Sequence, residues 1–326
     1  MNNVEHTEPH VLCFWDVEID PSVLDALRVV SHVDVRPPSR EFLLNNIGKY
    51  DVYLAALSVR IDEEIAACAG TGFTRLIYTP STGLDHLDLD AIARHGIEVR
   101  SIKTEFELLD SITATAELAL ALMLAVARKI PSAAQAALRG QWARDEFRGT
   151  QLSGKTLGVL GVGRLGSMLV DFARGLRMNV IGCDPAPRHR IPDLEYLPYE
   201  EMAPHCDVLS IHIHLTPENE RFLNASRLNM LKKGTILINT SRGRIIDESA
   251  LLDALASGRI AGAGLDVIDG EWRDDLEDHQ LIRYAQRHNN VIIVPHIGGV
   301  TLESQTAALR FVAERVAEII SVDKTA

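Results

Sequence analysis

Residues 157–166 read L-G-V-L-G-V-G-R-L-G, and this stretch decides the fold of the chain. A short apolar strand leads directly into a turn with three glycines, and a helix is predicted over 167–175. The next apolar strand, 179–183, ends at Asp184, 23 residues after the first glycine. A strand, a glycine turn, a helix, a second strand and an acid at this spacing predict a dinucleotide-binding βαβ unit.

Each glycine of the turn has a physical role in such a unit. Gly161 permits the tight turn, Gly163 lets the backbone approach a pyrophosphate, and Gly166 lets the helix pack closely on the strand. Through Arg164 and Leu165 the turn enters a helix N-terminus, whose N–H groups and dipole favour a bound phosphate. The alternative is a glycine turn in a doubly wound fold that binds nothing.

The acid at the end of the second strand indicates which dinucleotide is bound. The Asp184 carboxylate can accept hydrogen bonds from both ribose hydroxyls, and its charge repels a 2′-phosphate. The predicted cofactor is therefore NAD rather than NADP. Arg188 and Arg190 follow shortly after and weaken that preference.

The rest of the chain predicts an α/β protein with two doubly wound parallel-sheet domains. The first hundred residues alternate apolar strands with helical patterns, which indicates parallel βαβ units. The polar stretch 101–113 breaks this rhythm and marks a domain crossing. A helix is predicted over 114–129, a second βα series from 153 to 294, and a last helix over 302–320.

Composition excludes several classes of protein. The chain has 326 residues, a net charge of −12 and no run of Lys or Arg, so we expect no nucleic-acid partner. Four scattered cysteines without a C-x-x-C pair indicate a reducing compartment and no metal site. The polar N-terminus predicts no signal peptide, and the apolar run 118–127 is too short to span a membrane. We expect a cytoplasmic protein without a membrane partner.

Several further motifs, in this order and spacing, resemble one family, the D-isomer-specific 2-hydroxyacid dehydrogenases. They are T-A-E-L-A-L-A-L at 115–122, H-I-H-L-T at 212–216, I-N-T-S-R-G-R-I-I-D at 238–247, A-G-A-G-L-D-V at 261–267 and P-H-I-G-G at 295–299. The resemblance extends from about residue 52 to 320. It implies a flavodoxin-like substrate domain, residues 1–112 plus 300–326, and a Rossmann NAD-binding domain, residues 113–299. It also implies hydride transfer between NAD(H) and a small D-2-hydroxy or 2-oxo acid.

The chemistry of that reaction points to three residues. Arg242 follows the predicted strand 235–239, and its planar guanidinium matches a substrate carboxylate. His296 follows another strand and has a side chain suited to proton exchange near neutrality. Glu271, near the end of a third strand, would orient His296. The family's catalytic Arg, Glu and His match these three residues, although each taken alone also fits an ordinary surface or ion-paired side chain.

The resemblance also implies the remaining ligand contacts. Asp266 would contact the nicotinamide carboxamide, or else cap a turn. Two loops would bind the substrate, with Arg60 in one, and Thr82 and Gly83 in the other; a solvated arginine and a plain turn are the alternatives. Further cofactor contacts are expected at His212, Thr216, Thr240, Ser241, Arg242, His296, Gly298 and Gly299.

The sequence departs from the family at His214, where proline is usual, and in the charged segment 272–290, which we expect to be longer and helical. In the family the helix 114–129 and the segment 140–144 form a dimer contact, so a homodimer is expected; alternatively the second domain alone covers the helix. The chain ends after its last helix, so we expect no regulatory domain.

Two other functions remain possible at this point. One is an NAD(H)-sensing protein that resembles corepressors of the same fold. The other is a dehydrogenase of another small anion such as phosphite. Formate enzymes of the family carry Gln in place of Glu271, so this residue argues against formate.

Overall fold

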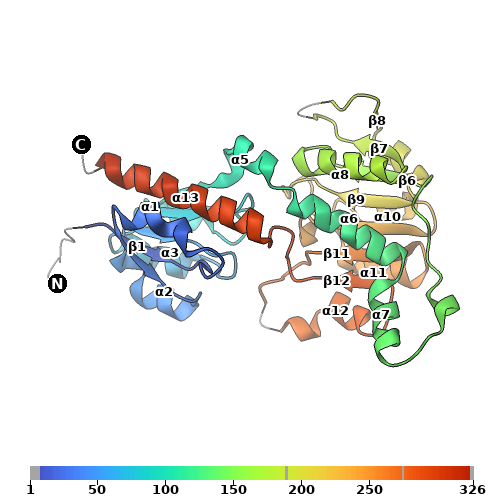
Figure 1. Cartoon of the computed structure of the whole chain (residues 1–326), viewed down its shortest axis with the longest axis horizontal. Helices are drawn as coiled ribbons and strands as arrows, with labels where there is room; N and C mark the ends of the chain where they lie inside the picture. The colour runs from blue at the N-terminus through green and yellow to red at the C-terminus, as the bar shows by residue number, and fades with distance from the viewer. Residues whose placement is uncertain (1–7, 188–189, 274, 324–326) are drawn as a thin grey trace. The chain divides into compact units, whose positions relative to one another are not determined.

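The structure is a computed structural model that describes residues 8–187, 190–273 and 275–323. The chain divides into two compact units (Figure 1). Unit 1 comprises residues 1–112 and 301–326, and unit 2 comprises residues 113–300. Each unit is built around its own parallel sheet.

Unit 1 contains a five-stranded parallel sheet with the strand order β2-β1-β3-β4-β5. This is the flavodoxin-like order, so the predicted fold class is confirmed for this unit. The strands are β1 (His10–Cys13), β2 (His32–Val35), β3 (Val52–Leu54), β4 (Leu76–Thr79) and β5 (Glu98–Ser101).

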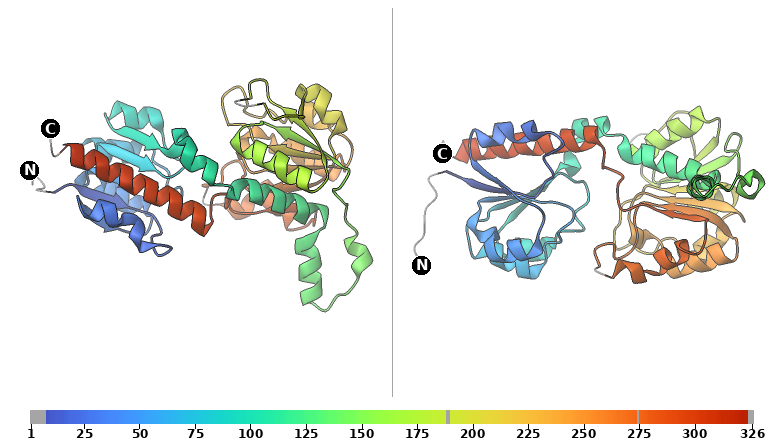
Figure 2. Two further views of the ribbon diagram at one scale, coloured as in Figure 1. Left: turned by 45° about the horizontal axis from the view of Figure 1, so that its top comes forward. Right: turned by 60° about the horizontal axis from the view of Figure 1, so that its bottom comes forward.

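Helices cover both faces of this sheet (Figure 2). Alternate residues of β1 face opposite sides: Val11 and Cys13 pack towards α1 and α13, whereas Leu12 packs towards α2, α3 and α4. The C-terminal helix α13 thus completes the core of the N-terminal unit. The helices are η1 (Pro21–Leu24), α1 (Asp25–Arg28), α2 (Arg40–Asn46), η2 (Ile47–Lys49), α3 (Glu63–Gly70), α4 (Leu89–Arg94), η3 (Ile102–Thr104), α5 (Phe106–Ser111) and α13 (Leu302–Asp323).

Unit 2 contains a seven-stranded parallel sheet with the order β12-β11-β10-β9-β6-β7-β8. The first strand of this unit is β6. The chain then adds β7 and β8 on one side of β6 and β9 to β12 on its other side, so the strand order reverses between β6 and β9. Doubly wound sheets bind ligands at the carboxyl ends of the strands around such a point. The strands are β6 (Thr156–Leu160), β7 (Asn179–Cys183), β8 (Glu195–Tyr196), β9 (Val208–Ile211), β10 (Thr235–Asn239), β11 (Ile260–Leu265) and β12 (Val291–Ile293).

The helices of unit 2 also form two layers. α6 and α8 pack on one face of the sheet, and α9 to α12 cover the other. The helices are α6 (Ala114–Ala127), α7 (Ile130–Leu138), η4 (Arg144–Phe147), α8 (Arg164–Gly175), α9 (Tyr199–Met202), η5 (Ala203–His205), α10 (Ala225–Met230), η6 (Gly243–Ile245), α11 (Glu248–Ala256), η7 (Leu276–Asp278) and α12 (Gln280–Ala285).

Three helix boundaries differ from the sequence prediction, one of them the end of α13, which lies at Asp323 rather than at residue 320. α8 begins at Arg164, three residues earlier than predicted, because Gly163 already serves as its N-cap. α6 ends at Ala127, since Lys129 adopts a left-handed backbone conformation (φ 52°) and the new helix α7 begins at Ile130, with Pro131 in its first turn. The segment 272–290, predicted to be helical, is helical only in η7 and α12 within its described part.

One apolar stretch among the described residues, Phe106–Ala127, is long and apolar enough to cross a membrane by length and composition. In the structure it is not one helix, because α5 ends at Ser111 and Ile112 is extended (φ −98°, ψ 103°). The following helix α6 has 14 residues, which gives about 21 Å against the roughly 30 Å of a bilayer core. α6 packs on β10, β11 and α8 and belongs to the core of unit 2.

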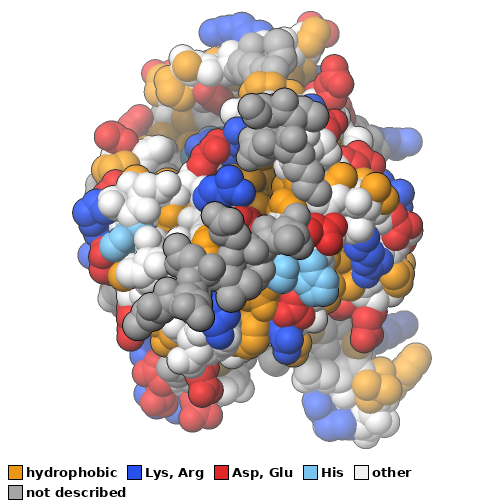
Figure 3. All heavy atoms as spheres, turned by 90° about the vertical axis from the view of Figure 1, so that its left-hand side faces the viewer, with side chains coloured by type: hydrophobic (Ala, Val, Ile, Leu, Met, Phe, Trp, Pro, Cys, Tyr) orange, Lys and Arg blue, Asp and Glu red, His pale blue; other side chains and the backbone are white. Residues whose placement is uncertain are grey.

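Acidic and basic side chains are interspersed on the face shown in Figure 3. The excess of acidic residues in the sequence is therefore not gathered into one patch on that face.

Candidate functional site

Arg242, Glu271 and His296 follow three strands that are neighbours in the sheet of unit 2. Arg242 comes three residues after β10, Glu271 six after β11, and His296 three after β12. All three strands are parallel, so the three residues emerge at the same carboxyl edge. The structure therefore brings the predicted trio to one edge of one unit.

Glu271 and His296 form a direct hydrogen bond. The His296 Nδ1 atom lies 2.7 Å from Glu271 Oε1. An ionised carboxylate only accepts hydrogen bonds, so it favours the proton on Nδ1 and leaves Nε2 for proton exchange with a substrate. His296 adopts a left-handed conformation (φ 52°), which is uncommon for a residue other than glycine.

Asp266 supports the loop that carries His296. The residue is 2% exposed, and its Oδ1 and Oδ2 atoms accept the backbone N–H groups of Ile297 (2.6 Å) and Gly298 (2.9 Å). Its carbonyl oxygen also accepts the His296 N–H. Burial raises the pKa of Asp266, and the two N–H donors and the nearby His296 oppose that rise. Asp266 therefore shapes the 296–298 loop, which agrees with the alternative from the sequence that this residue caps a backbone turn.

Asn239 fixes the turn that carries Arg242, and sequence reasoning missed it. This fully buried residue ends β10, accepts the Ser241 N–H through Oδ1 and donates from Nδ2 to the Arg242 carbonyl, both at 3.0 Å. Arg242 Nη1 donates to the Ser241 carbonyl (2.7 Å), and the Ser241 hydroxyl donates to the Ile213 carbonyl. The sequence signal that could have indicated this role is the amide side chain of Asn239 directly after the apolar run 236–238.

The glycine turn has the conformation that its sequence requires. Gly161 adopts φ 93°, and a Cβ atom there would lie 2.8 Å from the backbone of His212 and Ile213. A Cβ on Gly166 would clash with the Gly161 carbonyl oxygen, so the helix packs tightly on the turn. A Cβ on Gly163 would meet no atom within 4 Å, which leaves space at the N-terminus of α8.

Asp184 lies directly after β7 and is held by backbone donors. Its Oδ2 accepts the Val162 N–H and its Oδ1 accepts the Ala186 N–H, both at 2.9 Å. Arg190, expected to weaken the NAD preference, lies over the Tyr196 ring at 5.0 Å from its centroid. Arg188, the other arginine of that expectation, lies outside the described residues.

His212 follows β9, next to the glycine turn. Its Nε2 lies 2.8 Å from the Ser210 hydroxyl, and its backbone N–H donates to the Leu160 carbonyl. Burial lowers the pKa of His212 to about 4, so the imidazole is neutral at pH 7. Thr216 accepts the Asn219 N–H in the turn that follows, and His214 is exposed, with its carbonyl accepting from the Asn219 side chain.

These residues fit a nicotinamide dinucleotide. The space before α8 suits a pyrophosphate, and Asp184 stands at the end of the next strand, where a ribose is expected. The Thr240 hydroxyl is buried and makes no hydrogen bond to the described residues, so a bound ligand would supply its partner. Gly299 likewise has open space beside it. Among the described residues no group of three or more His, Cys, Asp or Glu side chains is arranged to hold a metal ion.

The predicted substrate contacts of unit 1 lie on loops after β3 and β4. Arg60 is exposed between β3 and α3. Thr82 and Gly83 lie in the turn after β4, where the Ser81 hydroxyl donates to the Gly83 carbonyl (2.8 Å). The roles of these three residues stay predictions.

Comparison with known proteins identifies the family. Residues 120–298 match the model described as "D-isomer specific 2-hydroxyacid dehydrogenase, NAD binding domain". The D-3-phosphoglycerate dehydrogenase of Methanocaldococcus jannaschii is 33% identical over 309 residues, covering 92% of this chain and 56% of the relative. The glyoxylate reductase of Thermococcus litoralis is 34% identical over 296 residues, covering 87% of this chain and 84% of the relative.

A solved structure agrees over nearly the whole chain. The D-lactate dehydrogenase from Aquifex aeolicus, complexed with NAD and lactic acid, is 26% identical with a TM-score of 0.80, covering 97% of this chain and 96% of that one. The chain spans about half the length of the phosphoglycerate dehydrogenases that it matches. The resemblance inferred from the motifs is confirmed, and the chain belongs to the D-isomer specific 2-hydroxyacid dehydrogenase family.

Proposed function

We propose that this chain is an NAD-dependent dehydrogenase that interconverts a small D-2-hydroxy acid and its 2-oxo acid. The observation that carries this proposal is the 2.7 Å hydrogen bond between His296 and Glu271, at the same sheet edge as Arg242. A histidine oriented by a carboxylate, with a guanidinium at the same sheet edge, supplies both proton exchange and carboxylate binding. NADH, when bound, supplies the hydride.

Each residue of the trio has a defined task in the reductive direction. The Arg242 guanidinium binds the substrate carboxylate and polarises the neighbouring carbonyl. Protonated His296 gives its Nε2 proton to the carbonyl oxygen as the carbonyl carbon receives the hydride, so that a hydroxyl group forms. Glu271 holds the ring through Nδ1 and stabilises the imidazolium form. Oxidation reverses both transfers, with neutral His296 taking the hydroxyl proton.

The other predicted contacts belong to the same proposal. The glycine turn and α8 bind the pyrophosphate, and Asp184 selects NAD over NADP. The backbone of Thr82 and Gly83 binds the substrate carboxylate, and Arg60 binds a second anionic group. The family relationship supports these roles. The four cysteines are all free, which supports a reducing, cytoplasmic setting.

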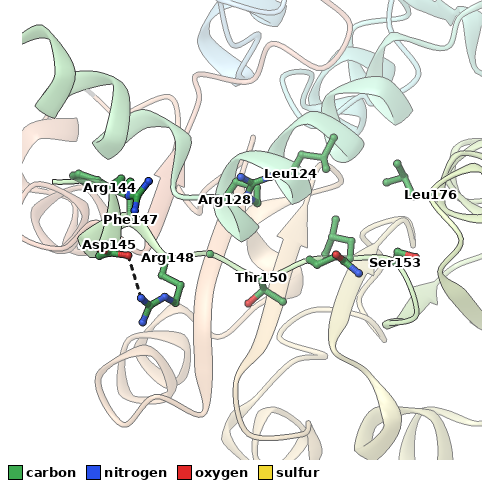
Figure 4. A pocket seen from close by; sticks show the side chains of 12 residues that line it. Leu124, Arg128, Arg144, Asp145, Phe147, Arg148, Thr150, Ser153 and Leu176 are labelled. Atoms are coloured by element: carbon green, nitrogen blue, oxygen red, sulfur yellow. Dashed lines mark hydrogen bonds and ion pairs between the residues drawn. The ribbon is translucent and has the colours of Figure 1, made fainter. Parts of the chain in front are cut away.

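We also propose a homodimer that is formed through unit 2. α7 and the segment after it project from the sheet of this unit (Figure 2), and Leu138 and Trp142 are 89% and 85% exposed. Beside this segment lies a pocket of about 710 Å³ with Leu124, Phe147 and Leu176 in its lining (Figure 4). Large exposed apolar side chains next to a pocket are typical of a protein–protein contact.

A substrate screen tests the proposed reaction. The purified chain is mixed with NADH and with each of about twenty 2-oxo acids, including pyruvate, glyoxylate, hydroxypyruvate and branched-chain and aromatic acids. We expect at least one acid to cause loss of the reduced-nicotinamide absorbance. NADH binding without turnover on any acid would contradict the proposal and would favour a sensing role or another anionic substrate.

A further inference from the structure

Two buried ionisable side chains of unit 2, Glu248 and His279, have no task in the proposed reaction. They are 8% and 3% exposed. Glu248 is the first residue of α11, six positions after Arg242, and His279 is the N-cap of α12 in the segment that follows Glu271. Buried ionisable groups are costly unless they are hydrogen-bonded, so their partners indicate why they are there.

Both side chains bind the peptide groups of one residue, Asp269. Glu248 Oε1 accepts the Asp269 N–H at 2.8 Å, and His279 Nε2 lies 3.0 Å from the Asp269 carbonyl oxygen. His279 Nε2 also lies 3.2 Å from Glu248 Oε2, which closes the set. We call this set, the two side chains and the Asp269 backbone, the Asp269 clamp.

The hydrogen bonds define the protonation of the clamp. The Leu281 N–H donates to His279 Nδ1 (3.2 Å), so this nitrogen carries no proton. Nε2 must then carry the proton, and it donates towards the Asp269 carbonyl and Glu248. Burial raises the pKa of Glu248, while the Asp269 N–H and the neighbouring His279 oppose that rise. Every polar atom of the two side chains therefore has a partner.

Asp269 lies between the segments that carry two residues of the catalytic trio. Asp269 is two residues before Glu271, separated from it by Gly270 in a left-handed conformation (φ 73°). The backbone of Gly243, the residue directly after Arg242, touches the backbone of Ile268 and Asp269 so closely that a Cβ atom there has no room. The Asp269 peptide is thus where the segment leaving Arg242 crosses the segment leading to Glu271.

We propose that Glu248 and His279 are positioning residues that act through Glu271: by holding both peptide groups of Asp269, they place the Glu271 carboxylate against His296. This inference rests on the proposed function, since it assigns the pair a part in the same reaction. The clamp touches neither substrate nor cofactor in the proposed site, and its effect reaches His296 only through the Asp269–Glu271 backbone.

Two variants break the clamp in different ways. Glu248→Gln places an amide N–H against His279 Nε2–H or against the Asp269 N–H, because one of its two oxygens becomes a donor. His279→Asn keeps an oxygen that can cap α12 but is too short to reach the Asp269 carbonyl. Glu277→Gln is the matched control for the first, since Glu277 is an exposed glutamate of the same segment. His205→Asn is the control for the second, at an exposed histidine of η5.

Hydrogen exchange tests the clamp independently of any activity. We expect peptides covering residues 267–273 to exchange faster in Glu248→Gln and His279→Asn than in the wild type, with no change in either control. Unchanged exchange in both clamp variants would overturn the proposal. General loss of protection across the sheet in one variant would mean that this variant misfolds. The exchange of residues 267–273 in the other variant then tests the proposal.

A double-mutant cycle tests the route through Glu271. We expect each clamp variant to lower kcat about 10- to 100-fold with little change in the Kd of NADH, and to shift the pH profile of kcat in the same direction as Glu271→Gln. The double variant Glu248→Gln/Glu271→Gln should be no slower than Glu271→Gln alone. The proposal would be overturned if the double variant lost the product of the two single losses in kcat, or if the clamp variants kept the kcat of the wild type. If Glu271→Gln itself leaves kcat unchanged, the proposed function fails, and the exchange result still decides whether the clamp holds the segment.

Discussion

The polar side chains at the carboxyl edge of unit 2 are held mainly by backbone groups. Asp184, Asn239 and Asp266 each bind two backbone groups through the two polar atoms of one side chain. Their orientations are therefore set by the fold before any ligand binds. Such preorganisation is what a site for charge transfer requires, because the groups need not reorganise during the reaction.

The Asp184 carboxylate leads to a prediction about the preference for NADH over NADPH. Replacing Asp184 with Asn removes the negative charge that opposes a 2′-phosphate and keeps one of the two oxygen acceptors. We expect the NADH-to-NADPH affinity ratio to fall about tenfold, which corresponds to about 1.4 kcal/mol. Titration calorimetry of both cofactors against wild type and variant measures this ratio. An unchanged ratio would show that another residue determines the preference.

His212 predicts a pH dependence of stability. Its pKa is about 4 in the folded chain against 6.5 for an unperturbed histidine, so the unfolded state binds more protons between these values. The stabilisation is complete above pH 6.5 and is lost as the pH falls towards 4. The free energy of unfolding should fall by roughly 1–3 kcal/mol over this pH range. The lower end of that range is expected because His212 is partly accessible to solvent.

The variant His212→Gln lacks this proton uptake. Its Tm should therefore fall less than that of the wild type when the pH is lowered from 7 to 5, as measured by calorimetry in matched buffers. Parallel losses of Tm in both proteins would contradict the assignment, because the remaining titratable groups are common to the two.

At the scale of the element, hydrophobic patterns were sufficient for strands such as β7 and β10 and for the helices α6, α8 and α13, whereas β8 and α7 were not predicted. The strands 179–183 and 235–239 match β7 and β10 because each has an apolar centre that is bounded by turns. The order of the strands came from the family resemblance. The side-chain to backbone contacts of Asn239, Glu248 and His279 were not predictable, since they depend on which loops meet after folding.

Two glycines at the same sheet edge give opposite predictions. Gly243→Ala forces a Cβ into the Ile268–Asp269 backbone, so we expect a loss of about 1–3 kcal/mol of stability. A Cβ at Gly163 meets no atom within 4 Å, so Gly163→Ala should lose only the roughly 0.5–1 kcal/mol that alanine costs at the N-cap of α8. Its methyl group occupies the space before α8 and should weaken NADH binding.

Thermal melts and NADH titrations of the two glycine variants separate these effects. Normal stability of Gly243→Ala would contradict the tight crossing of the two segments. Normal NADH affinity of Gly163→Ala would contradict a pyrophosphate site at the N-terminus of α8.

At the scale of the whole molecule, the chain forms two units with separate cores, and the exposed apolar residues Leu138 and Trp142 lie in unit 2. The proposed homodimer predicts that Trp142→Ala combined with Leu138→Glu converts a dimer into a monomer in light scattering. NADH binding should be retained, since neither residue belongs to the glycine turn or the catalytic trio. A wild-type monomer at micromolar concentration, or a dimer that survives the double substitution, would contradict the proposed interface.

The most direct measurement is the turnover of His296→Gln beside its affinity for NADH. With the 2-oxo acid that serves the wild type best, the variant should lose about 10²–10⁴-fold in kcat, because glutamine cannot donate the proton. Its Kd for NADH should stay within about threefold of the wild type, since the glycine turn and Asp184 are unchanged. Retained turnover in the variant would contradict the assignment of His296 as the proton donor, and with it the proposed catalytic site.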